Sequence, residues 1–136
     1  MKFEVEAYKG KKNITILRIM GNLDGSNYTH LIKKAEELFI DGTQNLLIDM
    51  AGCEFMSSAG LLALHNIDLI IRGRKPLNTK DGLRILDQIR VGNEARNPAK
   101  FKLVNLPPRI KTTLEQTGML DFYDHYEKLK KAVASF

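Results

Sequence analysis

The order of apolar and polar residues predicts a sheet whose strands alternate with helices. Residues 3–8 and 14–19 each alternate between the two kinds of side chain, and the glycine-containing turn between them predicts an antiparallel hairpin. The apolar run at 46–50 lies between two turns and predicts a buried central strand. Residues 101–104 predict another short strand, and 120–123 are expected to form an edge strand.

Apolar residues at helical spacing occupy the gaps between these strands. The first helix is expected to be capped by Ser26 or Asn27 and to end at Gly42. A long apolar stretch at 58–71 predicts a helix that packs on the sheet. Two further helices are expected at about 107–117, opened by two prolines, and at 127–136.

This order of elements predicts an α/β fold with one mixed, mostly parallel sheet of four to five strands. Parallel neighbours need a crossover, and a helix between strands supplies it, so only the first strand should run against the others. The helices are expected to pack mainly on one face of the sheet. A chain of 136 residues fits a single domain, here 1–136.

The positive charge is concentrated in one segment. Residues 72–100 contain eight basic and three acidic side chains, whereas the rest of the chain contains 13 of each. Residues 73–99 also break the alternation of strands and helices, so we interpret them as an atypical basic insertion with a short amphipathic helix at 81–90. The insertion either contacts a partner or is a solvated loop. It lacks the interleaved aromatic residues of a nucleic-acid site, and no specific nucleic-acid binding is expected.

The composition argues against several kinds of site. Cys53 is the single cysteine and three histidines are scattered, so the spacing of a metal site is absent and no metal or cofactor is expected. Cys53 is interpreted as a packing residue. The first residues lack the apolar run of a signal peptide, and no run is long enough to span a membrane, so a cytoplasmic protein is expected.

An enzyme is not expected. A Gly-x-Ser-x-Gly elbow fails because Met56 stands where its first glycine belongs, and the chain lacks a phosphate-binding loop of the Gly-Lys-Ser/Thr type.

The sequence from Asp49 to Leu61 carries the most informative local pattern. A buried strand ends, a loop turns outward, and a helix begins near Ser57 or Ser58. The first amides of a helix lack internal partners, and together with the helix dipole they favour an anion or a hydroxyl oxygen. The small neighbouring residues leave room for another protein to approach. A serine that only caps the helix is the simpler alternative.

The run Phe-Met-Ser-Ser-Ala-Gly-Leu at 55–61 resembles the signature of STAS-domain anti-sigma-factor antagonists. The run Gly-Asn-Leu-Asp at 21–24 is similar to the Gly-x-Leu-Asp that this family carries after its second strand. The segments 101–106 and 117–120 also match the family's late strand and helix. The resemblance covers about 3–72 and 100–130.

The resemblance implies a STAS-like fold and a phosphorylation switch at Ser58. Family members are similar in binding a serine-kinase anti-sigma factor of the GHKL ATPase type, which phosphorylates the motif serine, and a PP2C-type phosphatase removes the phosphate. A phosphate adds negative charge and bulk at a docking surface, and so evicts the partner. The residues expected to contact the partner are Asp24, Gly25, Met56, Ser57, Ser58, Ala59, Gly60 and Leu61.

Several alternatives stay open at this point. Many family members have Asp where this chain has Ser57, so Ser57 is a competing phosphate acceptor. Asp24 either borders the docking site or only forms an Asx turn. The alternative to a phosphorylation switch is a STAS domain that is not phosphorylated. Such a domain would be a scaffold or an accessory subunit, in a stress-signalling assembly or associated with a transporter. The sequence leaves the oligomeric state open.

Overall fold

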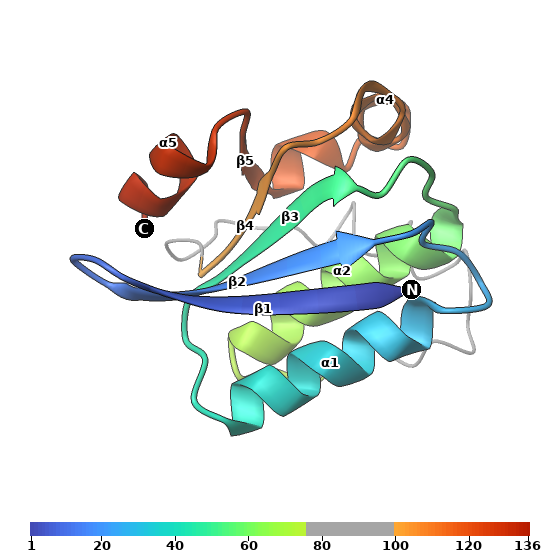
Figure 1. The fold of residues 1–136 in the computed structure, drawn as a ribbon. Helices are drawn as coiled ribbons and strands as arrows, with labels where there is room; N and C mark the ends of the chain where they lie inside the picture. The colour runs from blue at the N-terminus through green and yellow to red at the C-terminus, as the bar shows by residue number, and fades with distance from the viewer. Residues whose placement is uncertain (76–99) are drawn as a thin grey trace.

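The computed structural model describes residues 1–75 and 100–136 (Figure 1). Most of the expected insertion at 73–99, with its helix at 81–90, lies outside the described residues. The chain begins with the predicted hairpin of β1 (Lys2–Lys9) and β2 (Asn13–Met20), paired antiparallel. Although residues 3–8 alternate in the manner of a half-buried strand, β1 is mostly exposed, and only Phe3 of it is partly buried. As an edge strand that extends past the helices, β1 leaves both of its faces largely to solvent.

A single sheet with the strand order β1-β2-β3-β4-β5 forms the centre of the molecule. The strands β3 (Leu46–Gly52), β4 (Phe101–Val104) and β5 (Asp124–Tyr126) all run parallel to β2, as predicted. All of β4 and the first five residues of β3 are buried.

The edge strand was predicted at the wrong residues. The chain at Leu120–Phe122 forms a short 3₁₀ helix, η2, and the strand follows it. Met119 and Tyr123 are both buried, and the Tyr123 ring packs edge-to-face on Phe101 with ring centroids 5.7 Å apart. The Phe122 N–H donates to the Met119 carbonyl at 3.0 Å and the Tyr123 N–H donates to the Leu120 carbonyl at 3.4 Å. These hydrogen bonds close 3₁₀ turns, so the two amides do not pair with β4.

Three helices pack on one side of the sheet or at its edge. The helices α1 (Tyr28–Ile40) and α2 (Ser58–Ile71) lie side by side on one face (Figure 1). Because α2 is enclosed by α1 and the sheet, it is apolar around most of its circumference. The helix α4 (Pro108–Gln116) lies where a helix was predicted. It buries Ile110 and Leu114, and both join the same core as α1 and α2.

The last helix covers the opposite face of the sheet. This helix, α5 (Leu129–Ala134), is shorter than the predicted 127–136. Figure 1 shows it on the other side of the strands from α1 and α2. A second, smaller core lies beneath it. Its buried residues are Ile14, Ile16, Leu47, Val104 and Ala132.

A buried lysine fastens α5 to the sheet. Lys102 is 5% exposed, and its Nζ donates hydrogen bonds to the carbonyl oxygen of Ser135 at 2.9 Å and to the hydroxyl oxygen of Ser135 at 3.0 Å. The same ammonium lies 3.7 Å from Asp124 and 4.8 Å from the centre of the Phe136 ring. A buried charge needs hydrogen-bond acceptors in place of water. Ser135 supplies them only when α5 is docked, so the burial of Lys102 and the docking of α5 depend on each other.

Replacing Lys102 with Met should loosen α5 without unfolding the sheet. The methyl thioether fills the volume of the lysine stem but removes the hydrogen bonds to Ser135, which should lower the local stability of α5 by about 1–3 kcal/mol. Amide hydrogen exchange should quicken at 129–134 and stay unchanged in β3. Lys100→Met, at an exposed lysine beside the same strand, is the control, and equal exchange in the two variants would contradict the role given to Lys102.

Candidate functional site

Two loops that follow neighbouring strands are tied together at one end of the sheet. Leu23, after β2, and Met56, after β3, form a parallel β-bridge. The Leu23 N–H donates to the Phe55 carbonyl at 3.0 Å, and the Ser57 N–H donates to the Leu23 carbonyl at 2.9 Å. This bridge confirms that the Asp24 loop lies at the same end of the sheet as the serine motif.

The two motif serines occupy different environments. Ser58 is the first residue of α2 and is exposed, whereas Ser57 stands at the N-cap position and is half-buried. The Ser57 carbonyl accepts the N–H of Gly60 at 2.9 Å and of Leu61 at 3.3 Å. The Ser57 hydroxyl oxygen is buried and makes no hydrogen bond with any described residue. The expectation that a serine side chain caps this helix is therefore wrong, since neither hydroxyl does so.

Other residues of the predicted contact set lie beneath the loop surface. Met56 is 3% exposed, Leu61 is 1% exposed, and Gly60 is also buried. In this structure they support the loop from within, and their contact with a partner stays a prediction. Gly25 is exposed, and Asp24 and Ala59 are half-exposed, so these three residues are accessible at the surface.

The motif loop has no space for a side chain at Gly60. A Cβ built there would overlap the Cγ of Met56 and lie 3.0 Å from the Cγ of Leu23. A Cβ at Gly25 would meet nothing within 4 Å. The glycine in the helix therefore permits the close approach of the bridged loops, and the glycine in the β2 loop does not have this role.

Asp24 forms the Asx turn that the sequence suggested. Its Oδ1 accepts the Ser26 N–H at 2.9 Å and also the Ser26 hydroxyl. These hydrogen bonds lower the pKa of the Asp24 carboxyl. Asn27 fixes the loop from the other side, because its Oδ1 accepts the Asp24 N–H at 3.0 Å and its Nδ2 donates to the Asn22 carbonyl at 2.6 Å. Asn27 thus stands at the N-cap of α1 but bonds to the preceding loop. A docking role for Asp24 stays a prediction.

A buried carboxylate holds the end of β3 that leads into the motif. Asp49 accepts the Ala51 N–H at 3.0 Å and the Asn105 side-chain amide at 3.2 Å through Oδ1. Its Oδ2 lies 3.5 Å from the Nε of Arg18, which also pairs with Glu6 at 2.7 Å. This network fixes where β3 ends. The role of Asp49 in it was not predicted from the sequence.

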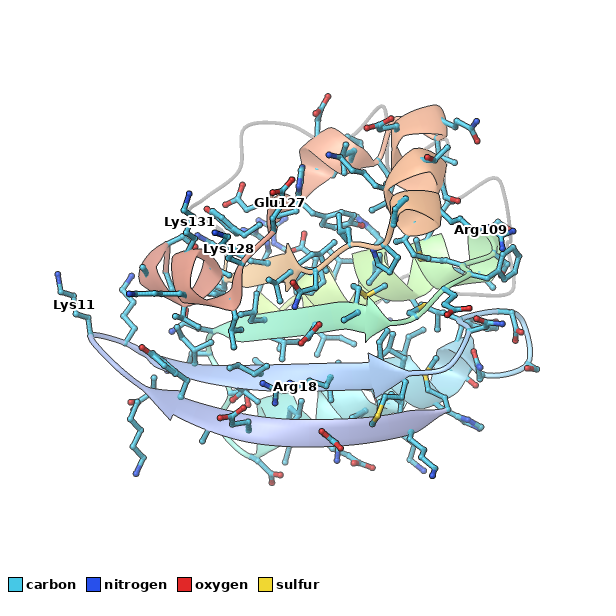
Figure 2. The ribbon with its side chains drawn as sticks, turned by 45° about the horizontal axis from the view of Figure 1, so that its top comes forward. Lys11, Arg18, Arg109, Glu127, Lys128 and Lys131 are labelled. Carbon is cyan, nitrogen blue, oxygen red and sulfur yellow. The ribbon has the colours of Figure 1, made fainter. Side chains whose placement is uncertain are left out.

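A groove lies beside the motif, and of the residues that line it only Met56 belongs to the predicted contact set. It has a volume of about 290 Å³, and it is lined by Phe55, Met56, Pro108, Arg109, Thr112 and Thr113. The guanidinium of Arg109 lies 6.0 Å from the centre of the Phe55 ring, which is 42% exposed. Figure 2 shows Arg109 at the motif end of the molecule. Nothing in the sequence links Arg109 to Phe55, since the fold of α4 brings them together.

Cys53 packs below this loop. It is buried, its thiol donates to the Phe55 carbonyl at 3.3 Å, and burial raises its pKa. The packing role given to it is therefore confirmed. Within 1–75 and 100–136 no group of three or more His, Cys, Asp or Glu side chains is placed to hold a metal ion. The described helices include none long and apolar enough to cross a membrane.

Comparison with known families gives a direct match over half of the chain. The model of the STAS domain matches residues 7–74. The chain belongs to the STAS domain family. This segment runs from β1 to the end of α2 and contains both bridged loops. No curated protein sequence matches the chain.

Solved structures share the STAS fold with this chain at low sequence identity. A putative anti-sigma factor antagonist from Thermotoga maritima is 16% identical, with a TM-score of 0.70 over 97% of this chain and 92% of that one. The Bacillus cell fate determinant SpoIIAA in its phosphorylated form is 14% identical, with a TM-score of 0.55 over 98% and 97%. A sulfate transporter family protein from Wolinella succinogenes is 14% identical, with a TM-score of 0.59 over 89% and 82%. These likenesses establish the fold.

Gly60→Ala should destabilise the STAS domain even though alanine favours a helix. Overlap with Met56 inside a packed core should cost about 1–3 kcal/mol, against a gain in helix propensity of up to about 1 kcal/mol. The midpoint of urea unfolding should fall. The control Gly25→Ala should change the stability by less than about 0.5 kcal/mol. An unchanged midpoint for Gly60→Ala would show that the loop accommodates a methyl group at this position, and would contradict the close packing around Gly60.

Proposed function

We propose that this STAS domain is an anti-sigma-factor antagonist that is switched off by phosphorylation at Ser58. Its partner is a serine-kinase anti-sigma factor of the GHKL ATPase type, and a PP2C-type phosphatase restores the active form. One observation carries the proposal: an exposed serine opens α2 on a loop that a β-bridge holds in place. Because sigma factors act on RNA polymerase, this function places the chain in the cytoplasm.

The exposure of the two serines favours Ser58 as the phosphate acceptor. A kinase must bring the γ-phosphate of ATP in line with the hydroxyl oxygen, so that oxygen must be accessible. Ser58 is exposed, whereas the Ser57 hydroxyl oxygen is buried. Phosphorylation of Ser57 would first require the bridged loop to open. Accessibility thus supports Ser58 over Ser57 as the proposed acceptor.

The proposed switch acts on docking, and the domain stays folded. A phosphoserine at the first position of α2 lies against the free amides of a helix start, which stabilise an anion. It also adds roughly −1.5 to −2 charges in the middle of a surface that a partner must cover without water. In the complex the phosphate would lose its water, whereas in the isolated domain it stays hydrated. Phosphorylation therefore disfavours the complex and leaves the domain folded.

The groove of Phe55 and Arg109 extends this docking surface. Phe55 offers an exposed aromatic ring, and Arg109 offers a charge that forms no ion pair with a described residue. Aromatic and arginine side chains are the residue types that most often dominate binding energy at interfaces. A partner residue with a carboxylate would match the guanidinium.

Substitutions at the two serines test the proposal directly. A GHKL-type kinase from the native host should be retained by wild type, Ser57→Ala and Ser58→Ala in a pull-down, whereas Ser58→Asp should weaken binding at least about tenfold. With ATP and the kinase, mass spectrometry should find phosphate on wild type and Ser57→Ala, and none on Ser58→Ala.

Two results would contradict the proposal. Binding by Ser58→Asp equal to that of wild type would show that negative charge at Ser58 does not control docking. Phosphate found on Ser57 alone would show that Ser57 is the phosphorylated residue. A chain from native cells that is never phosphorylated, yet binds a partner constitutively, would favour the scaffold or accessory-subunit alternative. Circular dichroism of each variant separates a loss of binding from a loss of fold.

A further inference from the structure

Six exposed lysines, three from the hairpin tip and three from α5, lie toward the end of the sheet opposite the serine motif. Two runs of the form Lys-x-Lys-Lys, at 9–12 and 128–131, are far apart in sequence. The first forms the tip of the β1–β2 hairpin, and the second begins α5. The two runs lie on the same side of the sheet, because Ile14, just after the hairpin tip, belongs to the same core as Ala132 of α5. Figure 2 shows Lys11, Lys128 and Lys131 toward this end, with Arg109 at the other.

These lysines form a surface of nearly uniform charge, which we call the lysine face. Its members are Lys9, Lys11, Lys12, Lys128, Lys130 and Lys131. All six are exposed, and none forms an ion pair with a described residue. Two acids lie near α5: Asp124 is 3.7 Å from the buried Lys102 ammonium, and Glu127 is exposed beside Lys128.

An exposed tyrosine lies within this surface. Tyr8 is 41% exposed and pairs with Ile14 across the hairpin, so it lies on the sheet face that α5 covers. Its ring packs over Gly10, where a Cβ would lie 2.8 Å from the ring carbon Cε1. The ring is thereby held at the hairpin tip among lysines.

We propose that the lysine face binds an anionic lipid surface, and that Tyr8 sits at the level of the headgroups. Lysines near a membrane gain from the negative potential of its phosphates, and tyrosine prefers the interface between headgroups and acyl chains. The binding is electrostatic and reversible, because it rests on lysine charges and one tyrosine ring. The serine motif, at the far end of the sheet, then faces away from the membrane and stays open to a protein partner.

The composition of the lysine face favours lipid over nucleic acid. It contains no arginine, the side chain that pairs bidentately with phosphates and guanine edges. Its one exposed aromatic ring has Gly10 against it, so it does not provide the stacking platform that single strands use. A hairpin tip and the six-residue α5 also give no element long enough to read a groove.

Vesicle sedimentation with the full chain tests this proposal. The protein should sediment with vesicles of equal parts phosphatidylcholine and phosphatidylglycerol, and stay in solution with phosphatidylcholine alone. Raising the ionic strength from about 0.1 M to about 1 M shortens the Debye length from about 10 Å to about 3 Å, and should release it. The triple variants K9Q/K11Q/K12Q and K128Q/K130Q/K131Q should each bind at least roughly tenfold more weakly.

A matched control separates the lysine face from overall charge. K2Q/K33Q/K75Q removes the same charge from exposed lysines outside the face, and should bind like wild type. Equal weakening in this control, or no sedimentation of wild type with the anionic vesicles, would overturn the proposal. Tighter binding to a DNA duplex than to the vesicles, with the same dependence on the six lysines, would overturn it in favour of nucleic acid. Unfolding midpoints verify that each variant is folded.

Discussion

The bridge between Leu23 and Met56 is the constraint on which the site depends. It joins the loop after β2 to the loop after β3, and so fixes the start of α2 relative to the Asp24 turn. Gly60 makes the bridge possible, because any larger residue would collide with Met56. The serine at the head of α2 is therefore displayed on a rigid support, and a rigid support limits the ordering that a partner must induce on binding.

The proposed switch uses a general property of helix starts. The free amides and the dipole of α2 are available to an anion at Ser58, so a phosphate there need not disturb the domain that carries it. What changes is the cost of covering that charge with another protein. The neighbouring serine shows how finely position matters, since one residue earlier in the chain the hydroxyl oxygen is already buried.

The two ends of the sheet offer different chemistry. The motif end presents Ser58, the Asp24 turn and the groove of Phe55 and Arg109, while the other end presents the lysine face. Charge counted by segment conceals this division, because outside 72–100 the chain has equal numbers of acidic and basic residues. Only the docking of α5, held by Lys102, puts the second run of lysines on the same side of the sheet as the first. A domain with separate faces at its two ends can bind a surface and a protein partner at once.

The sequence by itself determined the order of strands and helices along the chain, the antiparallel first strand, the inward faces of the helices and the serine at the start of α2. Periodicity, turn residues and a contiguous motif act over a few neighbours, and these decide such features. The tertiary structure decided which serine is accessible and how Asp49 is paired. It also decided that Arg109 lies beside Phe55 and that the lysines of α5 belong to the lysine face. It also moved the edge strand from 120–123 to Asp124–Tyr126 and exposed β1. These features depend on contacts between residues far apart in the chain, and a local pattern does not contain them.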